Sequence, residues 1–245
     1  MKKLMCAVAT LVVGVAMAEI TSANVVGYVT KTSRAGFNFY APAFKNCSST
    51  VLNVQDIKLS GDNVTDYTDN IQILDEGGAT SHLFVWIPAE DLGAEVGGWA
   101  NDEGTDLAEY FIKPGESILI STENEEVAVT FSGEVISGDF NLKSVAGFNF
   151  FGNATPVDID VQSIKIAGAD VTDYTDNIQI LDDGGATEHL FVWIPAEDLG
   201  AEVGGWANDD GTDLDEYTVV GGEGILISTE NADVGITIPG VKLAD

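Results

Sequence analysis

The chain has 245 residues, and 40 acidic residues against 10 basic ones give it a formal net charge of -30 at pH 7. Self-repulsion on this scale favours solubility and excludes nucleic acid and anionic lipid as plausible partners, because both are negatively charged. The charge favours cations instead, although a saline medium screens exposed charges beyond about 8 Å.

The chain opens with a pattern typical of a secretory signal peptide. Lys2 and Lys3 precede an apolar stretch too short to span a bilayer, and Ala16 and Ala18 form a small-residue cleavage box. We therefore expect cleavage after Ala18 and a secreted product located outside the cell, at the cell surface or in the periplasm. No later stretch reaches membrane-spanning length, so no membrane insertion is expected.

Cysteine contributes little to the expected fold. Cys47 is the only cysteine left after cleavage, so an intrachain disulfide is impossible and the exported chain depends on an apolar core. Nothing in the sequence around Cys47 indicates the electropositive surroundings that a reactive thiol needs, so a structural or incidental thiol is favoured.

The chain is dominated by one block that occurs twice. Residues 64–124 recur as residues 171–231, and only nine of the 61 aligned positions differ. Upstream, the segment AGFNFYAP at Ala35 has a partner AGFNFFGN at Ala146. The offset there is 111 rather than 107, so repeat 1 carries four extra residues between Tyr40 and Val54, which we expect to form a loop.

Short runs of β-branched and aromatic residues predict strands. In repeat 1 the predicted strands are residues 24–31, 71–74, 82–87, 110–112, 118–120 and 127–131. Between the second and third of these, DEGGATS predicts a hairpin with glycines at the bend. The run HLFVWI is apolar on both faces, which predicts either burial on both sides or an aromatic ledge.

Three local signals interrupt the strands. A step of three between Val161 and Ile164 predicts a bulge or a single helical turn, with a copy at residues 54–57. The segment AEDLGAEVGGW holds one helical turn at most, closed by glycine. Gly115 fits the position of a type II turn that needs positive φ, and repeat 2 keeps a glycine there.

These features predict an all-β protein. We expect two tandem homologous domains, each a β-sandwich or a partly closed β-barrel, following the signal peptide at residues 1–18. The expected ranges are 19–138 and 139–245, with a soft boundary near residues 133–143. A β-solenoid is the lesser alternative, because two repeats of this length are too few and too long for one.

The succession VVGYV, AGFNF, VQDIKLSG, NIQIL, GGW, PGESILIST and VTFSGEV resembles a family of exported β-repeat proteins from verrucomicrobial, kiritimatiellal and lentisphaeral bacteria. The resemblance spans nearly the whole mature chain and rests on structural motifs. It implies export and a β-rich architecture and carries no activity. Gly221 departs from the pattern, which has proline there.

An acidic loop in each copy is the candidate metal site. Hard cations such as calcium take six to eight oxygen ligands, which clustered carboxylates on a flexible loop can supply. The match to a calcium-loop motif fails at its first position, so a solvated loop is the favoured alternative. The candidate ligands are Asp102, Glu103 and Asp106, with Asp209, Asp210 and Asp213 in the second copy.

The tryptophans Trp86, Trp99, Trp193 and Trp206 are the candidate ligand-binding residues, as platforms on which sugars could stack. The competing interpretation is core filling, because tryptophan is the largest apolar side chain that a small unit can bury. Core filling is favoured.

No catalytic motif occurs in the sequence, so no enzymatic activity is expected. His82 and His189 occupy equivalent strand starts without an evident Ser or Cys partner, and among 40 acids carboxylate pairs arise by chance. We expect a non-enzymatic protein with a structural or adhesive role at the cell surface, in contact with polysaccharide or copies of itself. The alternative is a carbohydrate-binding protein, with calcium as the candidate cofactor.

Overall fold

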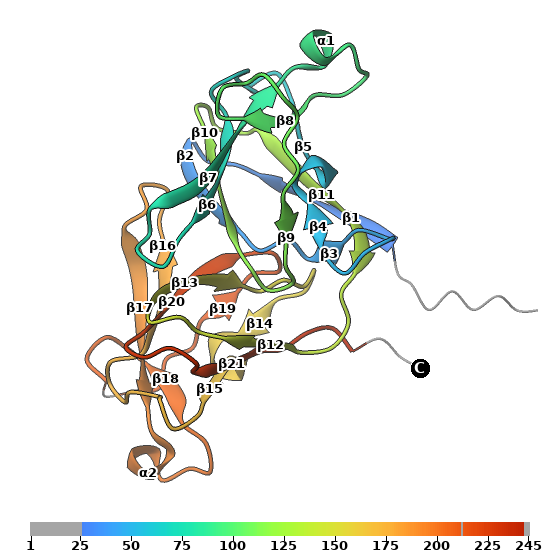
Figure 1. Ribbon diagram of the computed structural model, residues 1–245. Helices are drawn as coiled ribbons and strands as arrows, with labels where there is room; N and C mark the ends of the chain where they lie inside the picture. Colours follow the sequence, from blue (N-terminus) through green and yellow to red (C-terminus); the bar gives the residue numbers. More distant parts are fainter. Residues whose placement is uncertain (1–25, 212, 243–245) are drawn as a thin grey trace, which may run out of the picture.

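The computed structural model describes residues 26–211 and 213–242 (Figure 1). The chain is all-β, with 47% strand and 6% helix and with its strands in small antiparallel sheets, which confirms the all-β part of the prediction. In the described residues, no helix is long and apolar enough to cross a membrane. The expected signal peptide, residues 1–18, lies outside the described residues.

Repeat 1 begins with the predicted first strand and ends with a long strand that leads into repeat 2. Its elements are β1 (Val26–Thr32), β2 (Gly36–Tyr40), β3 (Phe44–Lys45), β4 (Leu52–Asn53), β5 (Ile57–Ser60), β6 (Asn70–Leu74), β7 (Thr80–Ile87), α1 (Ala89–Leu92), β8 (Gly98–Asn101), β9 (Phe111–Ile112), β10 (Ile118–Thr122) and β11 (Ala128–Val135).

Repeat 2 has the same order without a counterpart of β3 among the described residues. Its elements are β12 (Phe140–Lys143), β13 (Gly147–Gly152), β14 (Ile159–Asp160), β15 (Lys165–Ala167), β16 (Asn177–Leu181), β17 (Thr187–Ile194), α2 (Ala196–Leu199), β18 (Gly205–Ala207), β19 (Thr218–Val219), β20 (Gly224–Thr229) and β21 (Gly235–Ile238).

Each repeat builds two main antiparallel sheets. In repeat 1, β11 pairs with β1 on one side and with β3 and β5 on the other, while a second sheet has the order β2-β10-β6-β7-β8. Repeat 2 forms β12-β21-β15 and β13-β20-β16-β17-β18. One apolar cluster draws residues from both main sheets of repeat 1, and a second does the same in repeat 2.

The predicted local signals are confirmed. A 3-10 turn occupies Val54–Asp56, where the hydrophobic period changes, and its copy is Val161–Ser163. The helical turn α1 ends at Gly93, which adopts the left-handed conformation. Gly115 has a φ of 87°, as its predicted place in a turn requires.

The extra residues of repeat 1 do more than lengthen a loop. Phe44 and Lys45 form β3, which pairs with Val135 and Glu134 at the end of β11. Lys45 also forms an ion pair of 3.1 Å with Glu134. The insertion therefore adds a short strand that holds the end of β11, and the predicted loop is restricted to the turn that follows it.

The repeats face each other through reciprocal contacts. The Phe37 amide donates to the Asp183 carbonyl at 2.8 Å, and the equivalent Phe148 amide donates to the Glu76 carbonyl at 3.0 Å. The equivalent rings of Phe39 and Phe150 lie nearly parallel, 12° apart, with centroids 6.3 Å apart. Contacts that exchange equivalent residues in this way define a local twofold axis between the repeats.

This axis places equivalent parts of the repeats at opposite ends of the molecule. Figure 1 shows α1 at the top and α2 at the bottom, with β13 and β20 near the middle. The two acidic segments that follow these helical turns therefore lie far from the contact between the repeats.

Candidate functional site between the two repeats

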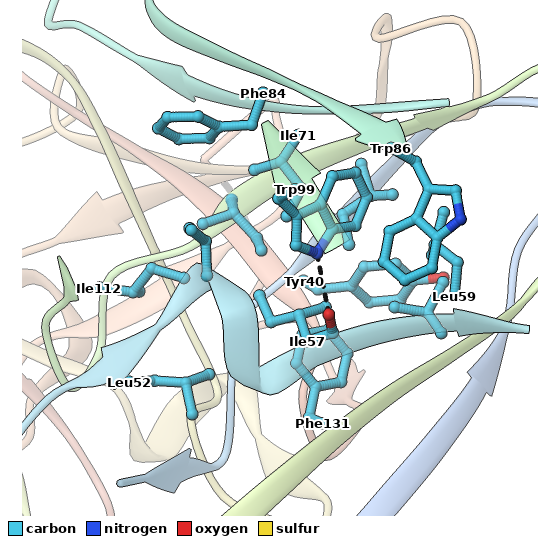
Figure 2. Close-up of a cluster of buried hydrophobic side chains, with 14 of the residues drawn as sticks. Tyr40, Leu52, Ile57, Leu59, Ile71, Phe84, Trp86, Trp99, Ile112 and Phe131 are labelled. Carbon is cyan, nitrogen blue, oxygen red and sulfur yellow. Dashed lines mark hydrogen bonds between the residues drawn. The ribbon is translucent and has the colours of Figure 1, made fainter. Parts of the chain in front are cut away.

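The four tryptophans belong to the core. Figure 2 shows Trp99 inside the apolar cluster of repeat 1, with its indole N–H donating to the Ile57 carbonyl at 2.8 Å. Trp86 packs edge-on against Trp99 with ring centroids 5.0 Å apart, and Trp86 is 4% exposed and Trp99 0% exposed. Trp193 and Trp206 repeat this arrangement at 4.9 Å, with 5% and 0% exposed. None of these rings has an exposed face on which a sugar could stack.

The acidic loops do not bring their carboxylates together. All six candidate ligands, Asp102, Glu103, Asp106, Asp209, Asp210 and Asp213, are exposed. In repeat 1 the loop is organised by Asn101, whose side-chain oxygen accepts from the Thr105 amide at 3.0 Å. Across the described parts of the chain, no three Asp, Glu, His or Cys side chains group as metal ligands would. The six side chains lie in solvent-exposed turns.

The two histidines contact aromatic rings, and the cysteine is exposed. The His82 ring is exposed and lies 5.0 Å from the Tyr110 ring, and His189 repeats this contact with Tyr217 at 4.9 Å. Cys47 is an exposed free thiol in the turn after β3. Each histidine ring therefore lies at the exposed edge of a small aromatic cluster.

The hollow surfaces of the molecule lie where the repeats meet. A hollow of about 320 Å³, which we call the axial hollow, is lined by equivalent residues of the two repeats. Its principal lining residues are Phe37, Phe39, Leu74 and Leu119 with their equivalents Phe148, Phe150, Leu181 and Leu226. Because each residue occurs with its counterpart, the axial hollow lies on the local twofold axis.

The outward faces of β2 and β10 explain this hollow. Along β10, Ile118 and Ile120 enter the core of repeat 1, so Leu119 points away from it. Leu119 is nevertheless only 3% exposed, because repeat 2 covers it. Phe37 in β2 is incompletely covered and remains 38% exposed. The sequence signal was present in ILI, which is apolar on both faces, and in GFNF, where Phe37 and Phe39 share one face.

Two further grooves flank the axial hollow at equivalent positions. The Glu116 groove has a volume of about 530 Å³ and includes Asp75, His82, Tyr110, Lys113, Glu116 and Lys143. The Glu223 groove has a volume of about 310 Å³ and includes Lys31, Arg34, Asp182, Asp183, Tyr217 and Glu223. Both grooves combine side chains of the two repeats, and each contains two basic residues of a strongly acidic protein.

The Glu223 carboxylate is held by a turn of repeat 2. The Val220 amide donates to one oxygen at 2.6 Å, and the Tyr217 hydroxyl donates to the other at 3.3 Å. Burial raises the pKa of Glu223, and these two donors together with the charges of Lys31 and Arg34 offset only part of that effect. Burial, reinforced by the Glu223 carboxylate, also raises the pKa of Tyr217 to about 12.

The equivalent Glu116 is neutralised within its own repeat. Its carboxylate accepts from the Lys113 amide at 2.9 Å and forms an ion pair with the Lys113 ammonium at 3.2 Å. Repeat 2 has Val220 in place of Lys113, so Glu223 lacks this local partner. Its positive neighbours instead come from repeat 1, at the end of β1 and in the turn before β2. The two grooves match each other in their numbers of acidic and of basic residues, and they differ in how those residues are paired.

No family model, curated protein or solved structure matches this chain. The described part of the chain has surfaces of three kinds: equivalent ends, an apolar hollow on the axis and two charged grooves beside it.

Proposed function

We propose that this chain is an exported, non-enzymatic β-repeat protein with a structural or adhesive role at the cell surface. In this proposal each repeat is a two-sheet sandwich domain, over residues 19–138 and 139–245, and the pair acts as a rigid connector. The observation that carries the proposal is that the equivalent helical turns α1 and α2 lie at opposite ends of the molecule (Figure 1). Two linked equivalent sites gain avidity when both engage a partner.

The end surface of each repeat exposes large apolar side chains among acids. In repeat 1 these are Tyr67, Val96 and Leu107, and in repeat 2 Tyr174, Val203 and Leu214. The Tyr67 hydroxyl donates to the Asp91 carboxylate at 2.5 Å. Tyr67 has a φ of 60°, an uncommon conformation for a bulky residue, and such strain concentrates at binding surfaces.

The differences between the copies fall largely elsewhere. Five of the nine substituted positions of the block line the Glu116 groove, namely Glu76, Ser81, Ile112, Lys113 and Ser117. None of the nine changes an exposed apolar residue of the end surface. Most of the substitutions thus lie where the copies meet, and the exposed apolar residues of the two ends are unchanged, as a connector with two equivalent ends requires.

Light scattering of the processed full-length protein during a calcium titration tests this role. The acidic ends repel each other until divalent cations screen them, so we expect particle mass to grow with calcium. Leu107→Asp should stop growth at dimers, because one end remains, and Leu107→Asp with Leu214→Asp should leave monomers. A parent protein that stays monomeric throughout the titration contradicts the proposal.

A carbohydrate-binding role is the second candidate, and the Glu116 groove favours it. The groove places the Tyr110 and His82 rings beside Glu116 and Lys113, which together offer a stacking surface and hydrogen-bonding groups. A monomer retained on an immobilised polysaccharide, with retention lost in Tyr110→Ala, supports this role. Retention unchanged by Tyr110→Ala excludes the groove as the sugar site.

A further inference from the structure

The axial hollow and the Glu223 groove adjoin each other, because Phe37, Phe39 and Leu181 line both. We propose that the combined depression binds one small carboxylate with an apolar ring as its body. The ring occupies the axial hollow, and the carboxylate lies at Lys31 and Arg34. This binding is independent of the adhesive role, which uses the ends of the molecule.

The axial hollow suits an apolar ring in size and lining. Its volume of about 320 Å³ falls within the range of roughly 300 to 1,000 Å³ that is typical of small-molecule sites. Phe37 and Phe148 are each 38% exposed although they lie in the contact between the repeats. A ligand ring placed among these phenyl groups removes that surface from water and gains the offset or edge-on contacts that aromatic rings prefer.

The carboxylate preference follows from the basic residues. In the described part of the chain, neither Lys31 nor Arg34 forms an ion pair. Most of the other basic side chains are engaged: Lys45, Lys113 and Lys143 pair with carboxylates, and Lys58 and Lys165 donate to backbone carbonyls. A planar guanidinium can bind a carboxylate through two parallel hydrogen bonds.

The Glu223 carboxylate leaves these cations available. Its oxygens already accept from the Val220 amide and the Tyr217 hydroxyl, and its charge draws Lys31 and Arg34 toward the groove without an ion pair. Burial raises the pKa of Glu223, and the charges of Lys31 and Arg34 offset part of that effect.

The duplicated protein should nevertheless have a single site. The equivalents of Lys31 and Arg34 in repeat 2 are Leu142 and Val145, so the Glu116 groove lacks the pair of cations at those positions. Lys143, which does line that groove, is paired with Asp233 at 3.2 Å. The axial hollow itself is shared between the repeats and holds one ligand at a time.

Calorimetric titration of the full-length protein with 2-naphthoate tests the proposal. We expect one equivalent to bind, at least 10-fold more tightly than naphthalene-2-methanol, which has the same ring and no charge. Arg34→Val and Lys31→Leu place the residues of repeat 2 at these positions, and each should weaken naphthoate at least 10-fold while leaving the alcohol unchanged. Phe148→Ala should weaken both ligands.

Lys113→Val is the matched control, because it makes the equivalent exchange in the Glu116 groove and should leave naphthoate binding unchanged. Thermal unfolding of every variant checks the fold, and Arg34→Gln replaces Arg34→Val where the latter is unstable. Two bound equivalents, equal affinity for acid and alcohol, or tighter binding of glucuronate than of naphthoate would each overturn the proposal. The last result would show that the hollow selects a polar ring.

Discussion

Single glutamines fasten the acidic loops to the body of each repeat. Gln55, in the 3-10 turn after β4, donates from its amide nitrogen to the carbonyls of Trp99 and Ala108 at 2.6 and 2.7 Å. Its amide oxygen accepts from the Trp99 amide at 3.2 Å. Gln162 repeats the arrangement in repeat 2. The Gln55 side chain therefore bonds to the backbone on both sides of the acidic loop, at Trp99 and Ala108.

Replacing Gln55 with Met should lower the free energy of unfolding by about 2 to 4 kcal/mol. Three backbone groups lose their hydrogen-bond partner, and each one that water does not reach costs about 1 to 3 kcal/mol. Urea denaturation gives the value, and Gln162→Met should match it. Gln72→Met is the control, since Gln72 bonds only to the side chains of Asn70 and Thr80. Equal losses in Gln55→Met and Gln72→Met would contradict this role.

The raised pKa of Glu223 makes a pH-dependent contribution to stability. In the folded protein this carboxyl keeps its proton to higher pH than in the unfolded chain, so its favourable contribution is complete below 4.5, its ordinary pKa. That contribution is lost as pH rises through the folded pKa. Glu223→Gln cannot ionise and can still accept from the Val220 amide, so it avoids the loss.

We therefore expect the urea midpoint of Glu223→Gln to exceed that of the parent at about pH 8, with a smaller difference at about pH 5. Measurements stay above the sequence pI of 4.1, where low net charge favours precipitation. A variant that is less stable than the parent at the higher pH would show that Lys31 and Arg34 outweigh the burial of the charge.

At the scale of elements, the sequence predicted the features of local structure that are determined by residues close together in the chain. The alternation in residues 127–131, the change of period before Ile57 and the glycine at position 115 each have a local cause, and each appears in the structure. The acidic loops were predicted as a metal site from composition, which supplies oxygen atoms but does not fix their positions. In the structure the turn around Asn101 leaves the candidate carboxylates exposed.

The contact between the repeats was not predicted, because its signal is ambiguous. Leu119 and Phe39 stand out as apolar residues facing away from the core of their own repeat, and alternation alone does not say what covers them. Their partners lie 107 and 111 residues away in the equivalent strands. A second copy on the same chain supplied the cover, and the grooves beside it follow from the incomplete fit.

Two glycines allow the hairpin turns of one repeat to approach β2 and β13 of the other. Gly36 has a φ of 96°, and a Cβ there would lie 2.6 Å from the Asp183 carbonyl oxygen. Gly147 is equivalent, with a φ of 101° and a distance of 2.9 Å to the Glu76 oxygen. Both the backbone conformation and the close approach exclude a side chain.

Gly36→Ala and Gly147→Ala should therefore each destabilise the protein by more than Gly138→Ala. Gly138 has a φ of 87° but no atom within 4 Å of its added Cβ, so it reports the conformational cost alone, about 1 to 2 kcal/mol. The excess at Gly36 and Gly147 measures the contact between the repeats. Thermal unfolding measures these losses of stability. Equal losses for all three variants would mean that the hairpin turns can move away from the added methyl group without a loss of stability.

At the scale of the molecule, the covalent link between the repeats is short and the contact between them is broad. Residues 136–139 join β11 to β12, and the Gly138 amide donates to the Val241 carbonyl at 2.9 Å. The contact joins backbone to backbone in both directions, since Ala41 bonds to Gly222 at 3.0 Å as Gly152 bonds to Gly115 at 3.1 Å. Apolar side chains of both repeats line the space between these bonds.

We expect the repeats to stay together when this link is cut. A protease site replacing residues 137–139 should yield, after cleavage, two fragments that co-elute with the mass of the intact chain at micromolar concentration. Cutting the link removes its effective concentration, so the remaining contact must hold by its own affinity. Leu119→Asp places a charge in the buried contact and should separate the cleaved fragments. Cleaved fragments that separate without that substitution would contradict this prediction. They would show that the covalent link, and not the contact between the repeats, holds the two ends apart as the proposed bridging requires.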